Sequence, residues 1–194
     1  MPTRLALYGG SFNPPHVAHQ LVALYVLETQ PVDELWFVPT YVHSLGKALA
    51  PYDDRVTMCE LACSALGGGR AKVSRAEETL AMRPGFTSSH TLDLVDYAIE
   101  LGYVFRLVVG IDILAETHKW YRWDDVATRA PLIVIGRTGY PVPDGGQVTG
   151  VTMPEISATH VRTLIAAGDD TALESLLPAS VLRYIAQRNL YDRA

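Results

Sequence analysis

Short apolar runs alternate with longer segments of helical character along the first 137 residues of the chain. Runs of strand length lie at 3–8, 33–39, 70–78, 104–110 and 130–137. Between them lie segments with helical spacing of apolar residues or helix-start and helix-stop residues, at 16–29, 53–66, 88–102, 112–118 and 123–129. This alternation predicts a doubly wound α/β fold, Rossmann-like, with a mostly parallel sheet and helices on both faces.

The last third of the chain has a different pattern. A polar segment rich in Gly and Pro lies at 139–147, and a short strand of edge character is expected at 148–156. Helical patterns at 157–168 and 178–189 then predict a helical C-terminal tail. No internal repeat or low-complexity linker interrupts the chain, so we expect a single domain over residues 1–194.

Composition and charge narrow the class of protein. With 48% hydrophobic and 19% charged residues, the chain has enough apolar residues to form a core. The net charge of −5 argues against a nucleic-acid partner. No apolar run reaches the roughly 20 residues of a membrane span and no secretory signal is visible, so we expect a cytoplasmic protein. Cys59 and Cys63, four residues apart on one helix face, are expected in the core.

The segment "LYGGSFNPPHVAHQ", residues 7–20, follows the first strand, where parallel sheets bind their ligands. Gly9 and Gly10 let a ligand approach the backbone, and Pro15 suits the first turn of a helix. His16 and His19 then lie on one face of that helix, beside amide groups without helical partners. This arrangement predicts a phosphate site, and a bound phosphate would favour the imidazolium form of the histidines.

Other interpretations of this segment are weaker. A tight turn with two surface histidines remains open if the segment is taken alone. A zinc site is disfavoured because the two histidines lack an obvious third ligand. The dinucleotide fingerprint G-x-G-x-x-G does not occur in the segment.

A second segment, "EISATHVRTLIAAG", places Ser157, Thr159 and Arg162 at the start of a late helix. Hydroxyl residues at such positions are most often helix caps. The planar guanidinium of Arg162 also matches phosphate oxygens. Two helix N-termini, one with histidines and one with hydroxyls and an arginine, suit a triphosphate.

The two segments carry a family resemblance. "GGSFNPPHVAH" resembles the G-G-[ST]-F-D-P-x-H-x-G-H signature of the nucleotidyltransferase superfamily, and "ISATHVR" resembles its late I-S-S-T-x-[IV]-R signature. The whole chain is similar to the bacterial nicotinate-nucleotide adenylyltransferases. It departs from the signatures at three positions, where Asn13 replaces aspartate, Ala18 replaces glycine and Ala158 replaces serine.

The resemblance implies transfer of the adenylyl group of ATP to nicotinate mononucleotide, giving deamido-NAD and pyrophosphate by in-line attack without a covalent intermediate. Mg²⁺ is expected as a cofactor that bridges the ATP phosphates, with no metal ligand among the protein side chains. Four residues are implied in catalysis: His16, His19, Lys47 and Arg162. The residues implied in ATP binding are Gly9, Gly10, Ser11, Phe12, His16, His19, Ser157, Thr159 and Arg162.

The resemblance also implies an acceptor site. Its residues are Tyr41, His43, Ser88, Asp112, Trp120 and Tyr121. Asp112 would bind a ribose hydroxyl, and Trp120 would stack on the pyridine ring. Trp120 could instead be a core anchor and Lys47 a solvated loop residue. Arg137 is either a cation of the cleft or a strand cap.

Other acceptors and assemblies stay open. Nicotinamide mononucleotide and 4′-phosphopantetheine are alternative acceptors, and a non-catalytic nucleotide-binding module is an alternative from another class. A cytidylyltransferase is disfavoured by the late signature. The sequence leaves a homo-oligomer open, because the tail helices can pack internally or against a second copy.

Overall fold

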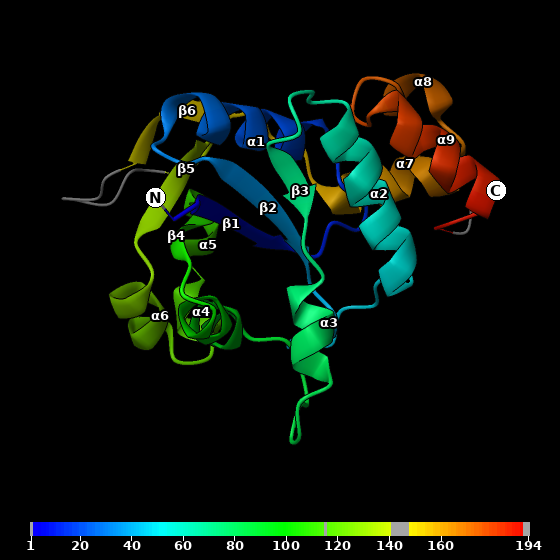
Figure 1. Ribbon diagram of the computed structural model, residues 1–194. Helices are drawn as coiled ribbons and strands as arrows, with labels where there is room; N and C mark the ends of the chain where they lie inside the picture. The colour runs from blue at the N-terminus through cyan, green and yellow to red at the C-terminus, as the bar shows by residue number, and fades with distance from the viewer. Residues whose placement is uncertain (1, 115, 141–147, 192–194) are drawn as a thin grey trace.

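The computed structural model describes residues 2–114, 116–140 and 148–191, which form a layered α/β structure (Figure 1). Within these residues one parallel sheet has the strand order β3-β2-β1-β4-β5-β6. Its strands are β1 (Arg4–Gly10), β2 (Glu34–Pro39), β3 (Ala71–Val73), β4 (Val104–Gly110), β5 (Leu132–Arg137) and β6 (Val148–Met153). The predicted fold class is confirmed, and every pairing in this sheet is parallel.

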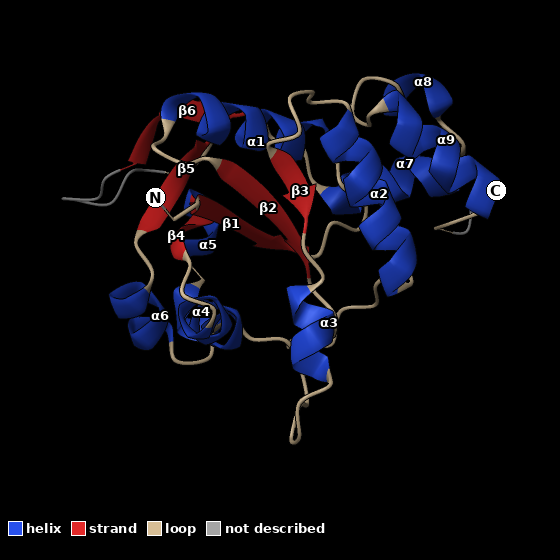
Figure 2. Cartoon of the chain, viewed as in Figure 1, coloured by secondary structure: helices blue, strands red, loops and turns tan. Residues whose placement is uncertain are grey.

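Helices cover both faces of the sheet (Figure 2). They are α1 (Val17–Thr29), α2 (Tyr52–Ser64), α3 (Ala76–Ala81), α4 (Thr91–Glu100), α5 (Ile111–Leu114), α6 (Trp123–Arg129), α7 (Ala158–Ala167), α8 (Asp170–Leu173) and α9 (Ala179–Arg188). A 3₁₀ turn at Thr117–Lys119 follows α5. Among the described residues, no helix combines the length and the apolar character that crossing a membrane requires.

The strands alternate their side chains between two apolar layers. Leu5 and Leu7 of β1 pack with α3, α4 and α6, whereas Ala6 between them packs with α1 and α2. In β2, Phe37 joins the layer of α1 and α2 and Val38 the opposite layer. Burial on both faces explains why the strands are nearly continuous apolar runs instead of alternating ones.

Two elements differ from the sequence expectation. The strand expected over 70–78 ends at Val73, and α3 begins three residues later at Ala76. The segment "AEETLA" consists mostly of good helix formers, with Glu77 and Glu78 in the first turn, where the helix dipole favours acidic residues. The short α8 was not expected. The expected loop at 139–147 lies outside the described residues from 141 onward.

The cysteines and the C-terminal helices complete the packing. Cys59 and Cys63 are buried against α1, as expected, and burial raises the pKa of the Cys63 thiol to about 12. Helices α7, α8 and α9 form a third apolar cluster with α2 and lie together beside it (Figure 1). Buried Asp54 of α2 accepts hydrogen bonds from Tyr184 (2.7 Å) and Arg188 (3.1 Å) of α9. These contacts hold the C-terminal helices against α2.

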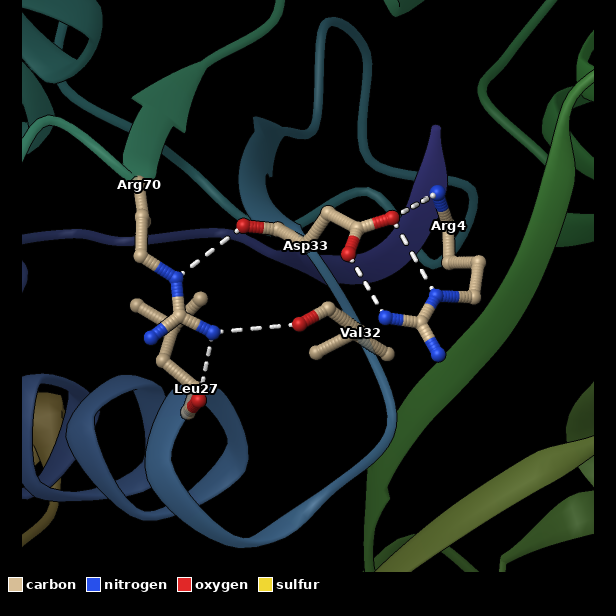
Figure 3. A network of polar contacts seen from close by, with 5 residues as sticks. All are labelled: Arg4, Leu27, Val32, Asp33 and Arg70. Atoms are coloured by element: carbon tan, nitrogen blue, oxygen red, sulfur yellow. Dashed lines mark hydrogen bonds and ion pairs between the residues drawn. The ribbon is translucent and has the colours of Figure 1, made fainter. Parts of the chain in front are cut away.

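At the amino ends of the strands, Arg70 and Asp33 tie the connection between α1 and β2 to its neighbours (Figure 3). The Arg70 guanidinium donates to the carbonyl oxygens of Leu27 (2.6 Å), Val32 (3.1 Å) and Asp33 (3.1 Å). The Asp33 carboxylate accepts from the backbone N–H of Arg4 (2.8 Å) and from its guanidinium. Arg70 therefore satisfies one carbonyl group in the last turn of α1, which the helix itself leaves open, and two in the connection that follows.

We predict that Arg70→Ala lowers the free energy of unfolding by about 2 kcal/mol, because hydrogen bonds to a charged group are lost and carbonyl groups are left without a donor. In a chain of this size the midpoint of thermal unfolding should fall by roughly 4–8 °C. The matched control is Lys72→Ala, which removes an exposed ion pair with Glu34 and should cost less than about 1 kcal/mol. Equal losses in the two variants would contradict the role of Arg70.

Candidate active site

Two cavities meet beyond the carboxyl ends of β1, β4 and β5, where the strand order reverses and open α/β sheets bind ligands. The first has a volume of about 710 Å³ and the second of about 380 Å³. The residues that line both are Tyr8, Ser11, His19, Lys47, Gly110, Asp112 and Arg137. The two cavities therefore adjoin at these residues, and ligands bound in the two cavities would meet there. We call this set of residues the junction.

The first cavity brings the two sequence motifs together. Arg162 of α7 donates through Nη1 to the carbonyl oxygen of Asn13, 149 positions earlier, at 2.8 Å. Its Nη2 donates to Thr159 Oγ1 at 3.3 Å. Ser157 is the N-cap of α7 and accepts from the His160 N–H at 3.2 Å. Ser157 is thus the cap that the sequence suggested, and it also lines the cavity with Thr159 and Arg162.

His16 and His19 form a stacked pair at the start of α1, with ring centroids 3.8 Å apart. The backbone N–H of His16 donates to Nδ1 of His19 at 3.0 Å. Since Nδ1 accepts this bond, the proton of a neutral His19 lies on Nε2. His16 is 5% exposed, and its Nδ1 has no hydrogen-bond partner in the described part of the chain. Both rings line the first cavity.

Burial sets the electrostatics of this pair when no ligand is bound. Burial, assisted by the positive charge of Arg137, lowers the pKa of His16 to about 4. Burial also lowers the pKa of His19 well below its usual range. Without a bound anion, both rings are therefore neutral at physiological pH. The amides of the first turn are also partly satisfied, because the Val17 N–H donates to the carbonyl oxygen of Leu176 at 2.9 Å.

The turn before α1 is shaped by Phe12. Its ring is buried against the aromatic core and lies edge-on to His19, with centroids 5.0 Å apart. Its φ of +44° is unusual for a residue with a side chain, and the buried ring holds the backbone in place. A Cβ on Gly10 would lie 3.1 Å from this ring. Gly9 and Gly10 line only the second cavity, whereas Ser11 lines both.

Asp112, in α5 directly after β4, and Arg137, the last residue of β5, form an ion pair at the junction. Arg137 also donates to the carbonyl oxygen of Ile156 at 3.4 Å. A Cβ on Gly110 would lie only 2.3 Å from Asp112 Oδ1, so this conformation of Asp112 requires glycine at 110. Of the two interpretations of Arg137, the structure supports the cation of the cleft. Its place at the end of a predicted strand was the sequence signal.

The second cavity is lined by aromatic and polar side chains. Trp120 lies edge-on to Trp123, and Tyr121 packs on the ring of His90, with centroids 4.7 Å apart. His43 accepts from the Leu45 N–H through Nδ1 at 3.1 Å. His43 and Lys47 are four positions apart in the sequence, and this turn places both beside the same cavity.

Tyr41 and Ser88, expected in the acceptor site, line neither cavity. The Tyr41 N–H is occupied by the carboxylate of Glu77 at 3.2 Å, and its ring packs on Tyr52. Ser89, one residue later than expected, lines the second cavity and accepts from the Val42 N–H at 3.2 Å. Burial raises the pKa of Glu77. Neither Glu77 nor His90 had a sequence signal, because both reach the site through tertiary packing.

Comparison with known proteins identifies the family. The cytidylyltransferase-like family matches residues 7–164. A probable nicotinate-nucleotide adenylyltransferase of Anaeromyxobacter sp. (strain K) is 47% identical over 189 residues, 96% of each chain. One from Myxococcus xanthus is 36% identical over 97% of this chain and 94% of its own. This chain belongs to the nicotinate-nucleotide adenylyltransferase family.

A solved adenylyltransferase of this kind shares the fold. The nicotinic acid mononucleotide adenylyltransferase of Plasmodium falciparum, solved with NaAD, superposes with a TM-score of 0.83 over 99% of this chain and 98% of its own. The two sequences are 18% identical. All three residues that depart from the family signatures line the first cavity: Asn13, Ala18 and Ala158.

The depressed pKa of His16 predicts a pH-dependent stability of the ligand-free protein. As pH falls from about 6.5 to about 4, the unfolded chain gains a proton that the folded His16 does not, so the free energy of unfolding falls. The contribution of this residue is on the order of 3 kcal/mol. Urea unfolding of the wild type and His16→Gln across this range should show the smaller loss in the variant. Identical pH profiles would contradict the assignment. His118→Gln, at an exposed position, is the control.

Proposed function

We propose that this chain transfers the adenylyl group of ATP to nicotinate mononucleotide, giving deamido-NAD and pyrophosphate. The observation that carries the proposal is the pair of adjoining cavities, whose shared wall carries His19, Lys47 and Arg137. A two-substrate group transfer needs two sites that present their reacting atoms to each other. The names of the relatives that cover nearly the whole chain support the same reaction.

We assign ATP to the first cavity. Its volume suits a nucleotide, and Ser157, Thr159 and Arg162 supply donors for the β- and γ-phosphates. The buried Nδ1 of His16, without a partner in the described residues, also suits a polar ligand. The first cavity is the larger of the two and is lined by both signature segments.

We assign the mononucleotide to the second cavity. Trp120 and Tyr121 offer aromatic faces for the pyridine ring. Asp112 at the junction is placed to accept from a ribose hydroxyl while Arg137 balances its charge. Gly9 and Gly10 supply bare backbone to this ligand. In this proposal Tyr41 and Ser88 do not contact the mononucleotide. Tyr41 supports the lining residue Glu77 through its backbone N–H, and Ser88 precedes the lining residue Ser89.

The reaction is a single in-line displacement at the junction. A phosphate oxygen of the mononucleotide attacks the α-phosphorus of ATP, and the bond from that phosphorus to the bridging oxygen breaks as pyrophosphate leaves. His19 donates through Nε2 to the α-phosphate, and Lys47 adds positive charge there. Arg162 holds the departing pyrophosphate. Catalysis is then positioning and electrostatic stabilisation.

Mg²⁺ enters the proposal as part of the substrate MgATP. No group of three or more His, Cys, Asp or Glu within the described residues is arranged to hold a metal ion. Magnesium commonly keeps several waters and binds substrate phosphates with few protein ligands. Its contribution here is to neutralise phosphate charge, while the side chains above orient the phosphates.

The acceptor is tested by measuring pyrophosphate release with ATP and Mg²⁺ and each acceptor in turn. Nicotinate mononucleotide should give the highest kcat/KM, ahead of nicotinamide mononucleotide and 4′-phosphopantetheine. Faster release with either of the other acceptors would contradict the substrate assignment. Absence of release with all three, in protein that remains folded, would contradict adenylyl transfer itself.

The role of His19 is tested by His19→Ala. Loss of a donor that stabilises developing charge should lower kcat by roughly 10²–10³-fold. Because the His16 N–H loses its acceptor, the free energy of unfolding should also fall by about 1–3 kcal/mol, so kcat is compared at a temperature where both proteins are folded. His118→Ala, at an exposed position outside both cavities, is the matched control and should keep wild-type turnover. Normal turnover in His19→Ala would refute its catalytic role.

A further inference from the structure

The side chain of Asn13 is buried between its own turn, residues 11–13, and the loop segment 48–50. Residues of both segments line the first cavity. Asn13 is 4% exposed. Its Oδ1 accepts from the backbone N–H of Ala50 at 3.0 Å, and its Nδ2 donates to the carbonyl oxygen of Ala48 at 3.4 Å. Both ends of the amide therefore bind the backbone of a loop more than 30 residues away, which lies between β2 and α2.

Arg55 strengthens the same connection from the other side. It is 1% exposed, and its Nε donates to the carbonyl oxygen of Ala50 at 2.9 Å. Its Nη1 donates to the carbonyl oxygen of Ser11 at 3.0 Å. The turn 11–13 and the loop segment 48–50 are thus joined by four hydrogen bonds from two buried side chains. We call this set the loop clamp.

The loop clamp lies next to Lys47. That lysine is exposed, lines both cavities and directly precedes Ala48. A lysine side chain has about 2 kcal/mol of rotamer entropy to lose when it is held in one place. A loop whose backbone also moved would add to this cost and would misplace the ammonium group relative to the junction. A fixed backbone at residue 48 confines the ammonium to the region of the junction.

Asn13 also reaches the opposite side of the first cavity. Its own carbonyl oxygen accepts from Arg162 at 2.8 Å. One residue therefore connects the loop that carries Lys47 with the arginine assigned to pyrophosphate. We propose that Asn13 is a positioning residue that sets Lys47 against the reacting phosphate, an inference that rests on the proposed adenylyl transfer.

The amide has a chemical consequence at this position. The family signature has aspartate where this chain has Asn13. A carboxylate keeps the bond from the Ala50 N–H but cannot donate to the Ala48 carbonyl oxygen. It also adds a negative charge beside the cavity assigned to the triphosphate. Asn13→Asp should therefore keep most of the positioning, whereas Asn13→Ala should lose both bonds.

The test is a double-mutant cycle of Asn13→Ala and Lys47→Ala, measured as kcat for pyrophosphate release. Asn13→Ala alone should lower kcat by roughly 10- to 100-fold, the size of effect expected from a small misplacement. In the Lys47→Ala background the same substitution should change kcat by less than about twofold, because the residue through which it acts is gone. Asn13→Asp should restore kcat to within about fivefold of the wild type. Equal losses in both backgrounds, or no rescue by Asn13→Asp, would overturn the proposal.

A second measurement examines the contact without relying on turnover. Hydrogen exchange of the Ala50 amide should be at least about tenfold faster in Asn13→Ala than in the wild type or in Asn13→Asp, because its acceptor is lost. Unchanged exchange would overturn the loop clamp. Failure of the proposed function would show differently, as a folded wild-type protein that releases no pyrophosphate with any acceptor.

Discussion

The reversal of strand order between β1 and β4 is the constraint on which the rest of the structure depends. It opens a crevice at the carboxyl ends of these strands. The start of α7 returns to the turn after β1 and lines the first cavity there, and Arg162 binds the Asn13 carbonyl oxygen. The packing of α2 against α7, α8 and α9 holds that helix in place. A site at the start of the chain is thus completed by a helix near its end.

Charge in this site is arranged around neutral histidines. Burial keeps His16 and His19 uncharged in the ligand-free protein, and the backbone directs the proton of His19 to Nε2. Positive charge comes from Lys47, Arg137 and Arg162, each in a different setting. Arg137 is balanced by Asp112, Arg162 binds protein oxygen atoms, and Lys47 is exposed at the junction. A donor that is already in place needs little reorganisation when charge develops on a phosphate.

The sequence predicted those features that depend on local pattern. Apolar runs buried on both faces gave the parallel sheet, and the two signature segments gave His16, His19, Ser157, Thr159 and Arg162. Apart from the meeting of these two segments at one cavity, features that depend on distant contacts were not predicted. Glu77 enters the site on a helix that the apolar pattern assigned to a strand, and Ser89 replaces Ser88 because a bridge with His43 fixes the register. The side-chain contacts of Asn13 with residues 48 and 50 have no local signal at all.

The central claim is that ATP and the mononucleotide occupy separate cavities and react where these meet. A crystal structure with an α,β-methylene analogue of ATP and nicotinate mononucleotide bound together tests it most directly. The account predicts the α-phosphorus at the junction, with one of its oxygens within hydrogen-bond distance of His19 Nε2. It also predicts the β- and γ-phosphates at Arg162 and the pyridine ring at Trp120. A triphosphate bound in the cavity lined by Trp120, or an α-phosphorus remote from His19, would contradict it.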